Sequence, residues 1–266
     1  IIPFLIIPQI LFSGVLVKFE KLNPVITSQS IVPLIGEVMA SRWAFEALAV
    51  NQFIENDYEK LFYDYDQQMS DANFKKNFWI PEMKAKVGKF KEYLRNKESA
   101  DIQDLTSDFK TVRGEVSKEN KFNDAITFDE LDQFTLDGIN QELLDDFSTY
   151  LTTLNKLYVR QWNYNIDEKD RVIREHQKTD EEKTAFNNLR NNFENESLSD
   201  LVTNKNEFNQ ITEYDGELIQ RADPVFNIPD GFRSHFYAPK KLVFGKYYST
   251  KQVNVLVLWL MSIALA

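Results

Sequence analysis

The chain contains no cysteine, only two histidines and only eight glycines among 266 residues. The absence of cysteine excludes disulfides, zinc–thiolate sites and thiol nucleophiles. Neither histidine stands at a metal-ligand spacing from the other or from carboxylates, so we expect His176 and His235 to be surface residues. The sequence also lacks a GxxxxGK[ST] phosphate loop, a GxSxG nucleophile elbow and a calcium-binding loop. We therefore predict that this chain is not an enzyme and itself binds no cofactor or metal.

Charged residues are missing from both ends of the chain. Residues 1–17 carry no charge, and as a helix they would rise about 25 Å, somewhat less than the roughly 30 Å hydrocarbon core of a bilayer. Residues 253–266 are also uncharged. We predict a transmembrane helix over 1–17 and the start of a final one over 246–266, both truncated. The alternative is a buried core strand or helix; a signal peptide is disfavoured because no basic residue precedes the apolar run.

The segment over residues 18–53 has a mixed, amphipathic character. Lys18 marks an exit to water, and from Ile35 to Phe53 apolar residues and alanine recur around a few charges. Aromatic side chains next to charged ones are typical of a membrane–water interface. We therefore predict an interfacial, re-entrant segment that presents Arg42, Trp43, Phe45 and Glu46. The alternative is an ordinary core helix of the part that follows.

Residues 54–245 are expected to form an acidic, α-helical insertion outside the membrane. The whole chain has a net charge of -10, and this part, with 26 basic and 38 acidic residues, is more negative still, which disfavours nucleic acid and anionic lipid as its partners. Apolar residues from Leu143 to Trp162 follow one helical stripe, and a return helix passes through Phe186 and Phe193. The pattern predicts a long helical hairpin. Two capping patterns, Thr127 with Glu130 and Ser197 with Asp200, predict helix starts.

Beyond residue 206 closely spaced prolines predict an irregular return segment, with a short strand at Glu217–Gln220. Before the final apolar run, aromatic residues stand beside lysines, a pattern typical of an interfacial belt. The belt consists of Tyr237, Phe244, Tyr247, Tyr248, Lys240, Lys241 and Lys246. The predicted fold class is therefore mainly α, with two truncated transmembrane helices flanking a helical insertion.

Three sequence elements resemble one family of membrane proteins. They are Phe12-Ser13-Gly14, the run Arg42-Trp-Ala-Phe-Glu-Ala-Leu48 followed by Asn51-Gln-Phe53, and Phe244-Gly-Lys-Tyr-Tyr248. In order and spacing they are similar to the last two membrane helices of ABC exporter permeases of the G-subfamily, or ABC-2, type. The long segment between them resembles the larger loop of bacterial fused ATPase–permease relatives.

The resemblance implies a function and candidate residues. In such exporters two permease copies form a central path that cytoplasmic domains open and close by binding ATP and Mg²⁺, so the cofactors would lie outside this fragment. An exit gate would map to Val15 and Leu16, although the family pattern has leucine where Val15 stands. Ile10, together with Ile7 or alternatively Ile6, would face the substrate cavity. The alternative for all of these residues is a lipid-facing or helix-packing role.

The implied location is the inner, or cytoplasmic, membrane, where the protein would be multi-pass with a periplasmic or extracellular insertion. Lysines on the insertion side of the spans argue for the opposite orientation, but the positive-inside rule applies to loops much shorter than this one. Expected partners are the bilayer, a nucleotide-binding domain, a second copy in a homodimer, and an envelope protein or transported substrate at the insertion. The rival hypothesis is a membrane-anchored helical interaction or sensor domain without a transport path.

Overall fold

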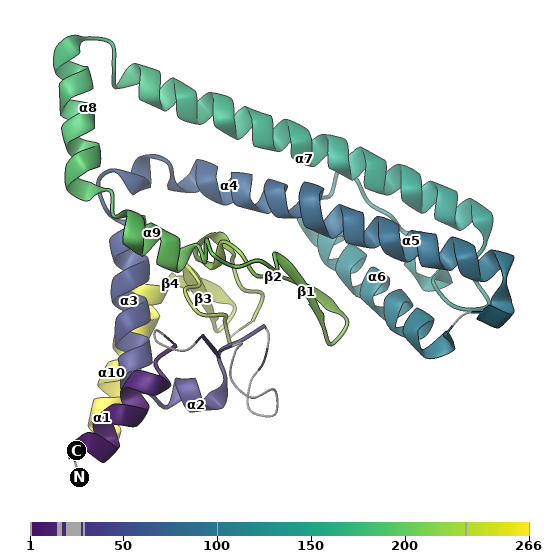
Figure 1. Cartoon of the computed structure of the whole chain (residues 1–266), viewed down its shortest axis with the longest axis horizontal. Coiled ribbons are helices and arrows are strands. Elements are labelled where there is room, and N and C mark those ends of the chain that lie inside the picture. The colour runs from purple at the N-terminus through teal and green to yellow at the C-terminus, as the bar shows by residue number, and fades with distance from the viewer. Residues whose placement is uncertain are drawn as a thin grey trace. The chain divides into compact units, whose positions relative to one another are not determined.

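The computed structural model describes residues 2–14, 18–19, 28, 30–99, 101–231 and 233–265. Most of these residues lie in helices, which confirms the mainly α fold class (Figure 1). Within the described ranges, no helix combines the length and the apolar character needed to cross a bilayer. The predicted gate residues Val15 and Leu16 lie outside the described residues.

The chain divides into two compact units that each collect segments distant in sequence. The first unit contains Ile1–Gln67, Glu168–Asn209 and Gln220–Ala266, and therefore both chain ends. The second contains Gln68–Asp167 and Gln210–Ile219. The boundaries fall inside helices α4 (Tyr63–Phe74) and α7 (Gln141–Glu175), which contribute to both units.

Three helices pack side by side at one end of the first unit (Figure 1): α1 (Ile2–Leu11), α3 (Ala40–Ile54) and α10 (Thr250–Leu265). The Ser41 hydroxyl donates to the Gln9 carbonyl at 2.6 Å, which fixes α1 against the first turn of α3. Helix α1 is shorter than the predicted span over 1–17. Gly14 adopts a φ of 81°, a left-handed conformation that continues no α-helix and that glycine adopts without strain.

The first unit also contains a hairpin of strands β3 (Lys240–Val243) and β4 (Lys246–Ser249), which the sequence analysis did not predict. This corrects the expected helix over 246–266, because residues 246–249 are extended and α10 begins only at Thr250. The Thr250 amide donates to the Pro239 carbonyl at 3.1 Å, so strand and helix are joined without a loop. The first unit also contains two short helices, α2 (Leu34–Glu37) and the 3₁₀ helix η6 (Pro224–Phe226).

Helix α8 (Asp180–Phe193) follows α7 after a short turn at residues 176–179. Its Phe186 ring packs against Tyr58 and Phe62, beside the 3₁₀ helix η2 (Glu59–Leu61), and against His176. Aromatic contacts on the segment after α3 therefore fix the return helix. The predicted long helix and return helix are therefore both present as successive helices, and their packing as a hairpin stays a prediction.

Side-chain caps mark the starts of several described helices, and none of these caps is one that the sequence predicted. Asp101 caps α6 (Ile102–Phe122), Thr179 and Glu182 form a reciprocal capping box at α8, and Asn195 caps α9 (Glu196–Val202) two residues before the predicted Ser197. Thr127 caps no α-helix, because the chain there makes only the 3₁₀ helix η5 (Glu130–Gln133). A capping box satisfies the unpaired backbone amides in the first turn of an α-helix. The short 3₁₀ helix after Thr127 does not offer such a turn.

The second unit is helical with one β-hairpin. Helix α4 passes through a π-helical turn, η3 (Lys75–Trp79), into α5 (Ile80–Arg95), and the 3₁₀ helix η4 (Lys97–Ser99) leads to α6 (Ile102–Phe122). Strands β1 (Ile211–Tyr214) and β2 (Glu217–Gln220) pair through a two-residue turn, so the predicted strand at 217–220 is confirmed. Lys86 of α5 binds Glu213 of β1 at 2.7 Å, which attaches the hairpin to the helices.

Aromatic rings fill the core of the second unit. Phe90 stacks on Phe109 with centroids 4.5 Å apart, and Phe134 meets Phe147 edge-on at 5.0 Å. Each of these four rings is nearly or completely buried. A core of this kind gives the unit its own hydrophobic stabilisation, because each buried aromatic side chain contributes about 1.5–3 kcal/mol.

Candidate functional site

Helix α3 carries two opposite charges into the interior of the first unit. Arg42 and Glu46 stand one helical turn apart and therefore on the same face of α3, and both side chains are completely buried. Strand β3 adds Lys241, which is 3% exposed, and α10 adds the buried Asn254. These four residues are called the buried charge cluster below. Charged side chains are almost never buried without a partner, so the contacts within the cluster decide whether it is stable.

The Glu46 carboxylate is the centre of this cluster. Its Oε2 lies 3.0 Å from Lys241 Nζ and accepts a hydrogen bond from Asn254 Nδ2 at 2.7 Å. Its Oε1 accepts from the backbone amide of Tyr237 at 3.2 Å. Burial by itself would raise the pKa of Glu46, but the nearby charges of Lys241 and Arg42 and the hydrogen bonds hold it below its ordinary value. Glu46 is therefore an ionised anion that joins three separate elements.

Arg42 is held by charge and by ring stacking. Its Nη1 lies 3.5 Å from Glu37 Oε2 and 3.6 Å from Glu46 Oε2, distances of ion pairs without a short hydrogen bond. Its guanidinium carbon lies 4.0 Å from the ring centroid of Trp43. In the described part of the chain no group accepts a hydrogen bond from the guanidinium nitrogens. Loss of either carboxylate would therefore leave a poorly compensated buried cation.

The apolar residues of the same helices point outward. Leu48 of α3 is 71% exposed, and Trp259 of α10 is 66% exposed. The other exposed apolar side chains on α1 and α10 are Phe4, Ile6, Ile7, Ile10, Leu11, Val255, Leu256, Leu260, Ile263 and Leu265. We call this set, with Leu48 and Trp259, the outer apolar face. The charges of α3 are therefore buried while apolar side chains of α1 and α10 are exposed, although α3 also packs Val50 and Phe53 into an apolar core. In a water-soluble helix bundle charges usually face solvent and apolar residues face the core.

His235 lies beside the buried charge cluster and is partly buried, so the expectation of a surface residue holds only in part. Its Nε2 lies 2.8 Å from the Pro224 carbonyl, and since a carbonyl only accepts, this nitrogen carries the proton. Burial lowers the pKa of His235. The ring is therefore neutral and holds η6 against the segment before β3. His176 is exposed at the end of α7, as expected.

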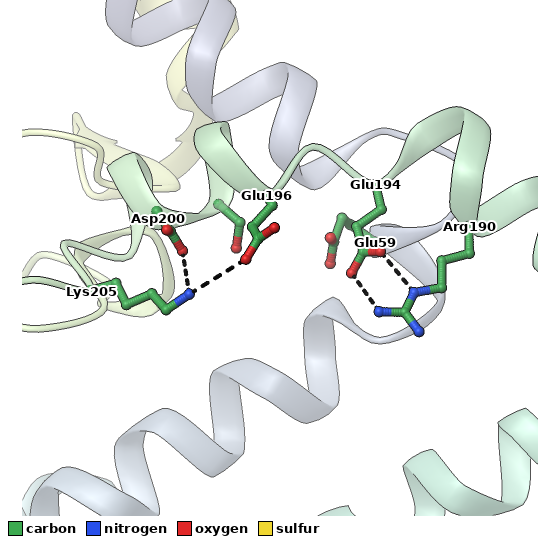
Figure 2. A pocket seen from close by; sticks show the side chains of 7 residues that line it. Glu59, Arg190, Glu194, Glu196, Asp200 and Lys205 are labelled. Carbon is green, nitrogen blue, oxygen red and sulfur yellow. Dashed lines mark hydrogen bonds and ion pairs between the residues drawn. The ribbon is translucent and has the colours of Figure 1, made fainter.

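A second polar feature of the first unit is a hollow of about 290 Å³ formed by η2, α8 and α9 (Figure 2). It is lined by Glu59, Arg190, Glu194, Glu196, Ser199, Asp200 and Lys205. Both cations are paired with carboxylates, Arg190 with Glu194 at 2.7 Å and Lys205 with Asp200 at 2.8 Å. Burial, Asp66 and Glu194 raise the pKa of Glu59. The hollow lacks a nucleophile paired with a base, so it offers no arrangement for covalent catalysis.

The structure separates the predicted site residues into two groups. Ile7 and Ile10 lie on α1 and are about half exposed, as part of the outer apolar face. Arg42 and Glu46 belong to the buried charge cluster, whereas Trp43 and Phe45 are partly buried beside it. The predicted interfacial role of this segment stays a prediction.

Sequence reasoning missed Lys241 and Asn254 as members of the cluster. Both lie far from Glu46 in sequence, but each carried a local signal. Lys241 stands in the alternating run around Phe244-Gly245, which is typical of a hairpin with one inward-facing side. Asn254 is the polar residue inside an apolar helical run, and such a residue usually has a buried partner.

The buried charge cluster holds α3, β3 and α10 together, and its amine, Lys241, is held by Glu46 and the Ser234 hydroxyl. In the described ranges no group of three or more His, Asp or Glu side chains is arranged to hold a metal ion. Comparison of the chain with models of protein families, with curated proteins and with solved structures finds no match to any of them.

Proposed function

We propose that this chain is the membrane-permease portion of an ATP-driven exporter of the ABC-2 type. The two apolar ends would contribute to the translocation path, and the acidic helical part would cover its external side. The observation that carries the proposal is a contrast between α3 and its two neighbours. The charges Arg42 and Glu46 of α3 are buried, whereas α1 and α10 expose large apolar side chains.

Lipid is the solvent in which that arrangement is stable. Soluble proteins rarely expose large contiguous apolar patches, whereas charged residues at membrane depth are turned inward and paired. Helix α10 carries one charge, Lys251 in its first turn, and then none as far as Leu265. Helix α1 carries no charge. In the exporter these helices would contact acyl chains, and the buried charge cluster would fix the angle at which α10 enters the membrane.

Membrane residence and sidedness are tested first, in cells that express the intact protein. The chain has no cysteine, so single cysteines can be introduced at Asn192, exposed on α8, and at Ile263, exposed on α10. We expect the protein to resist alkaline extraction. An impermeant maleimide should label Asn192→Cys in intact spheroplasts, and lipid should protect Ile263→Cys until denaturation. Ready extraction with labelling of both positions would contradict a membrane protein.

Transport is tested separately from anchoring. Purified intact protein in nanodiscs should hydrolyse ATP, and the double substitution Val15→Ala with Leu16→Ala should change the basal rate if these residues form the exit gate. Phe4→Ala, a lipid-facing change in the same apolar run, is the matched control and should leave the rate unchanged.

The rival function, a membrane-anchored interaction domain, has one structural observation in its favour. The second unit has its own aromatic core and is therefore a folded domain. Two membrane anchors would be enough to hold such a domain at the membrane surface. In that case the intact protein in nanodiscs would show no ATP hydrolysis, while its membrane residence and labelling pattern would be the same.

A further inference from the structure

The tip of the β3–β4 hairpin carries a phenylalanine where its turn favours a different residue. Phe244 and Gly245 form a two-residue turn in which both residues have positive φ, 49° and 77°. Such turns favour asparagine, aspartate or glycine in the first position, because a bulky side chain is strained in the left-handed conformation. Phe244 is fully exposed, so no packing within the protein offsets that strain.

The same chain contains the ordinary form of this turn. Strands β1 and β2 are also joined by two residues of positive φ, Asp215 at 52° and Gly216 at 78°. There the first position is an aspartate, one of the residues that the turn favours. The comparison indicates that Phe244 is not needed to make its turn and that its ring serves a contact outside the protein.

The surroundings of Phe244 have the composition of a membrane-surface contact. Tyr247 and Tyr248 of β4 are each nearly half exposed, and the lysines at positions 240, 246 and 251 are exposed. The whole chain has a net charge of -10, so lysines close together on one exposed hairpin stand out locally. Lysines beside exposed aromatic rings favour the phosphate layer of an anionic bilayer. The other side of the hairpin is fixed to the protein, since Lys241 binds both Glu46 and the Ser234 hydroxyl.

The hairpin is also continuous with the outer apolar face. Strand β4 runs into α10 at Thr250, and the hairpin lies at the end of α10 opposite the C-terminus (Figure 1). We infer that the β3–β4 hairpin is an interfacial wedge: Phe244 inserts among lipid headgroups while Lys240 and Lys246 bind lipid phosphates. This inference rests on the proposed membrane residence of α10 and adds a second, shallow lipid contact to it.

Fluorescent probes on introduced cysteines test the wedge. The intact protein is reconstituted into nanodiscs of phosphatidylcholine with phosphatidylglycerol, with an environment-sensitive dye on Phe244→Cys or, as the matched control, on Asp215→Cys in the other hairpin turn. We expect a shallow lipid-borne spin label to quench the dye at 244 and aqueous iodide to quench the dye at 215. Equal iodide quenching at both positions, in protein that has entered the nanodiscs, would overturn the wedge alone. Failure to enter nanodiscs would instead contradict the proposed function.

A second pair of variants tests the Phe244 side chain itself, with the dye at a different position. The probe is placed at Lys246→Cys, with either the native Phe244 or Phe244→Asn. Because Asn-Gly is the favoured sequence for this turn, the hairpin should stay folded in both. Lipid quenching at 246 should fall in the Phe244→Asn background. Unchanged quenching would show that Phe244 does not hold the hairpin in the interface.

Discussion

Glu46 and Lys241 are 195 positions apart in sequence, yet Glu46 Oε2 lies 3.0 Å from Lys241 Nζ and both side chains are buried. The pair joins α3 to the strand that precedes α10. Removal of one member of a buried pair is costly because the other charge stays buried without compensation. The stability of the joint between α3 and the β3–α10 segment therefore depends on this pair.

Glu46→Gln is expected to destabilise the first unit by about 3–5 kcal/mol, because Lys241 and Arg42 then lose their central counter-charge. Thermal unfolding in nanodiscs measures the effect. The double variant with Lys241→Met should lose clearly less than the sum of the two single variants. Lys183→Gln, at an exposed lysine on α8 of the same unit, is the control and should change little. Additive losses in the double variant would contradict a direct pair.

His235 predicts a stability that depends on pH. Its pKa is lowered in the folded protein, so below its ordinary value of 6.5 the unfolded chain binds a proton that the folded chain does not. Folding stability should be fully present above that value and decline as the pH falls toward the folded pKa. In thermal unfolding scanned downward from pH 7, His235→Gln should reduce this decline. His176→Gln, at an exposed histidine, should leave it unchanged; the reverse result would contradict a neutral His235.

The mainly α class and the strand at 217–220 could be predicted from the sequence because both depend on local periodicity. The partners of Glu46 could not, since residues 46, 241 and 254 come together only through tertiary packing. The alternating residues around Phe244-Gly245 fit an interfacial belt and a hairpin equally well, so their sequence alone does not decide between the two. Local patterns mark the elements, whereas burial of the charges of α3 is decided by which elements meet.

The capping patterns show the same limit. Thr127 matches a capping box by sequence but precedes a 3₁₀ turn, whereas Thr179 makes the real box with Glu182. Thr179→Ala should therefore cost about 1 kcal/mol of stability, the usual effect of losing an N-cap. Thr127→Ala should not show a capping loss. Hydrogen exchange of the first-turn amides of α8 reports the change locally; unaltered protection there would contradict the cap.

Two glycines should respond in opposite directions to alanine. Gly88 lies within α5 with open space around it, so Gly88→Ala should stabilise the second unit by about 0.5–1 kcal/mol. Gly216 has a φ of 78° and Lys110 side-chain atoms 3.3 Å from the position of an added Cβ. Gly216→Ala should destabilise by about 1–2 kcal/mol. Chemical denaturation measures both, and equal effects would contradict the turn geometry.

If the proposed function holds, lipid covers the outer apolar face of α1 and α10. Labelling with a lipid-soluble photoactivated carbene, in membranes that contain the intact protein, measures that coverage residue by residue. Mass spectrometry should find the label on Trp259, Leu260 and Ile263 of α10 and on Phe4 of α1, and not on the second unit. Unlabelled α1 and α10 that are instead modified by a water-soluble carbene reagent would contradict the account.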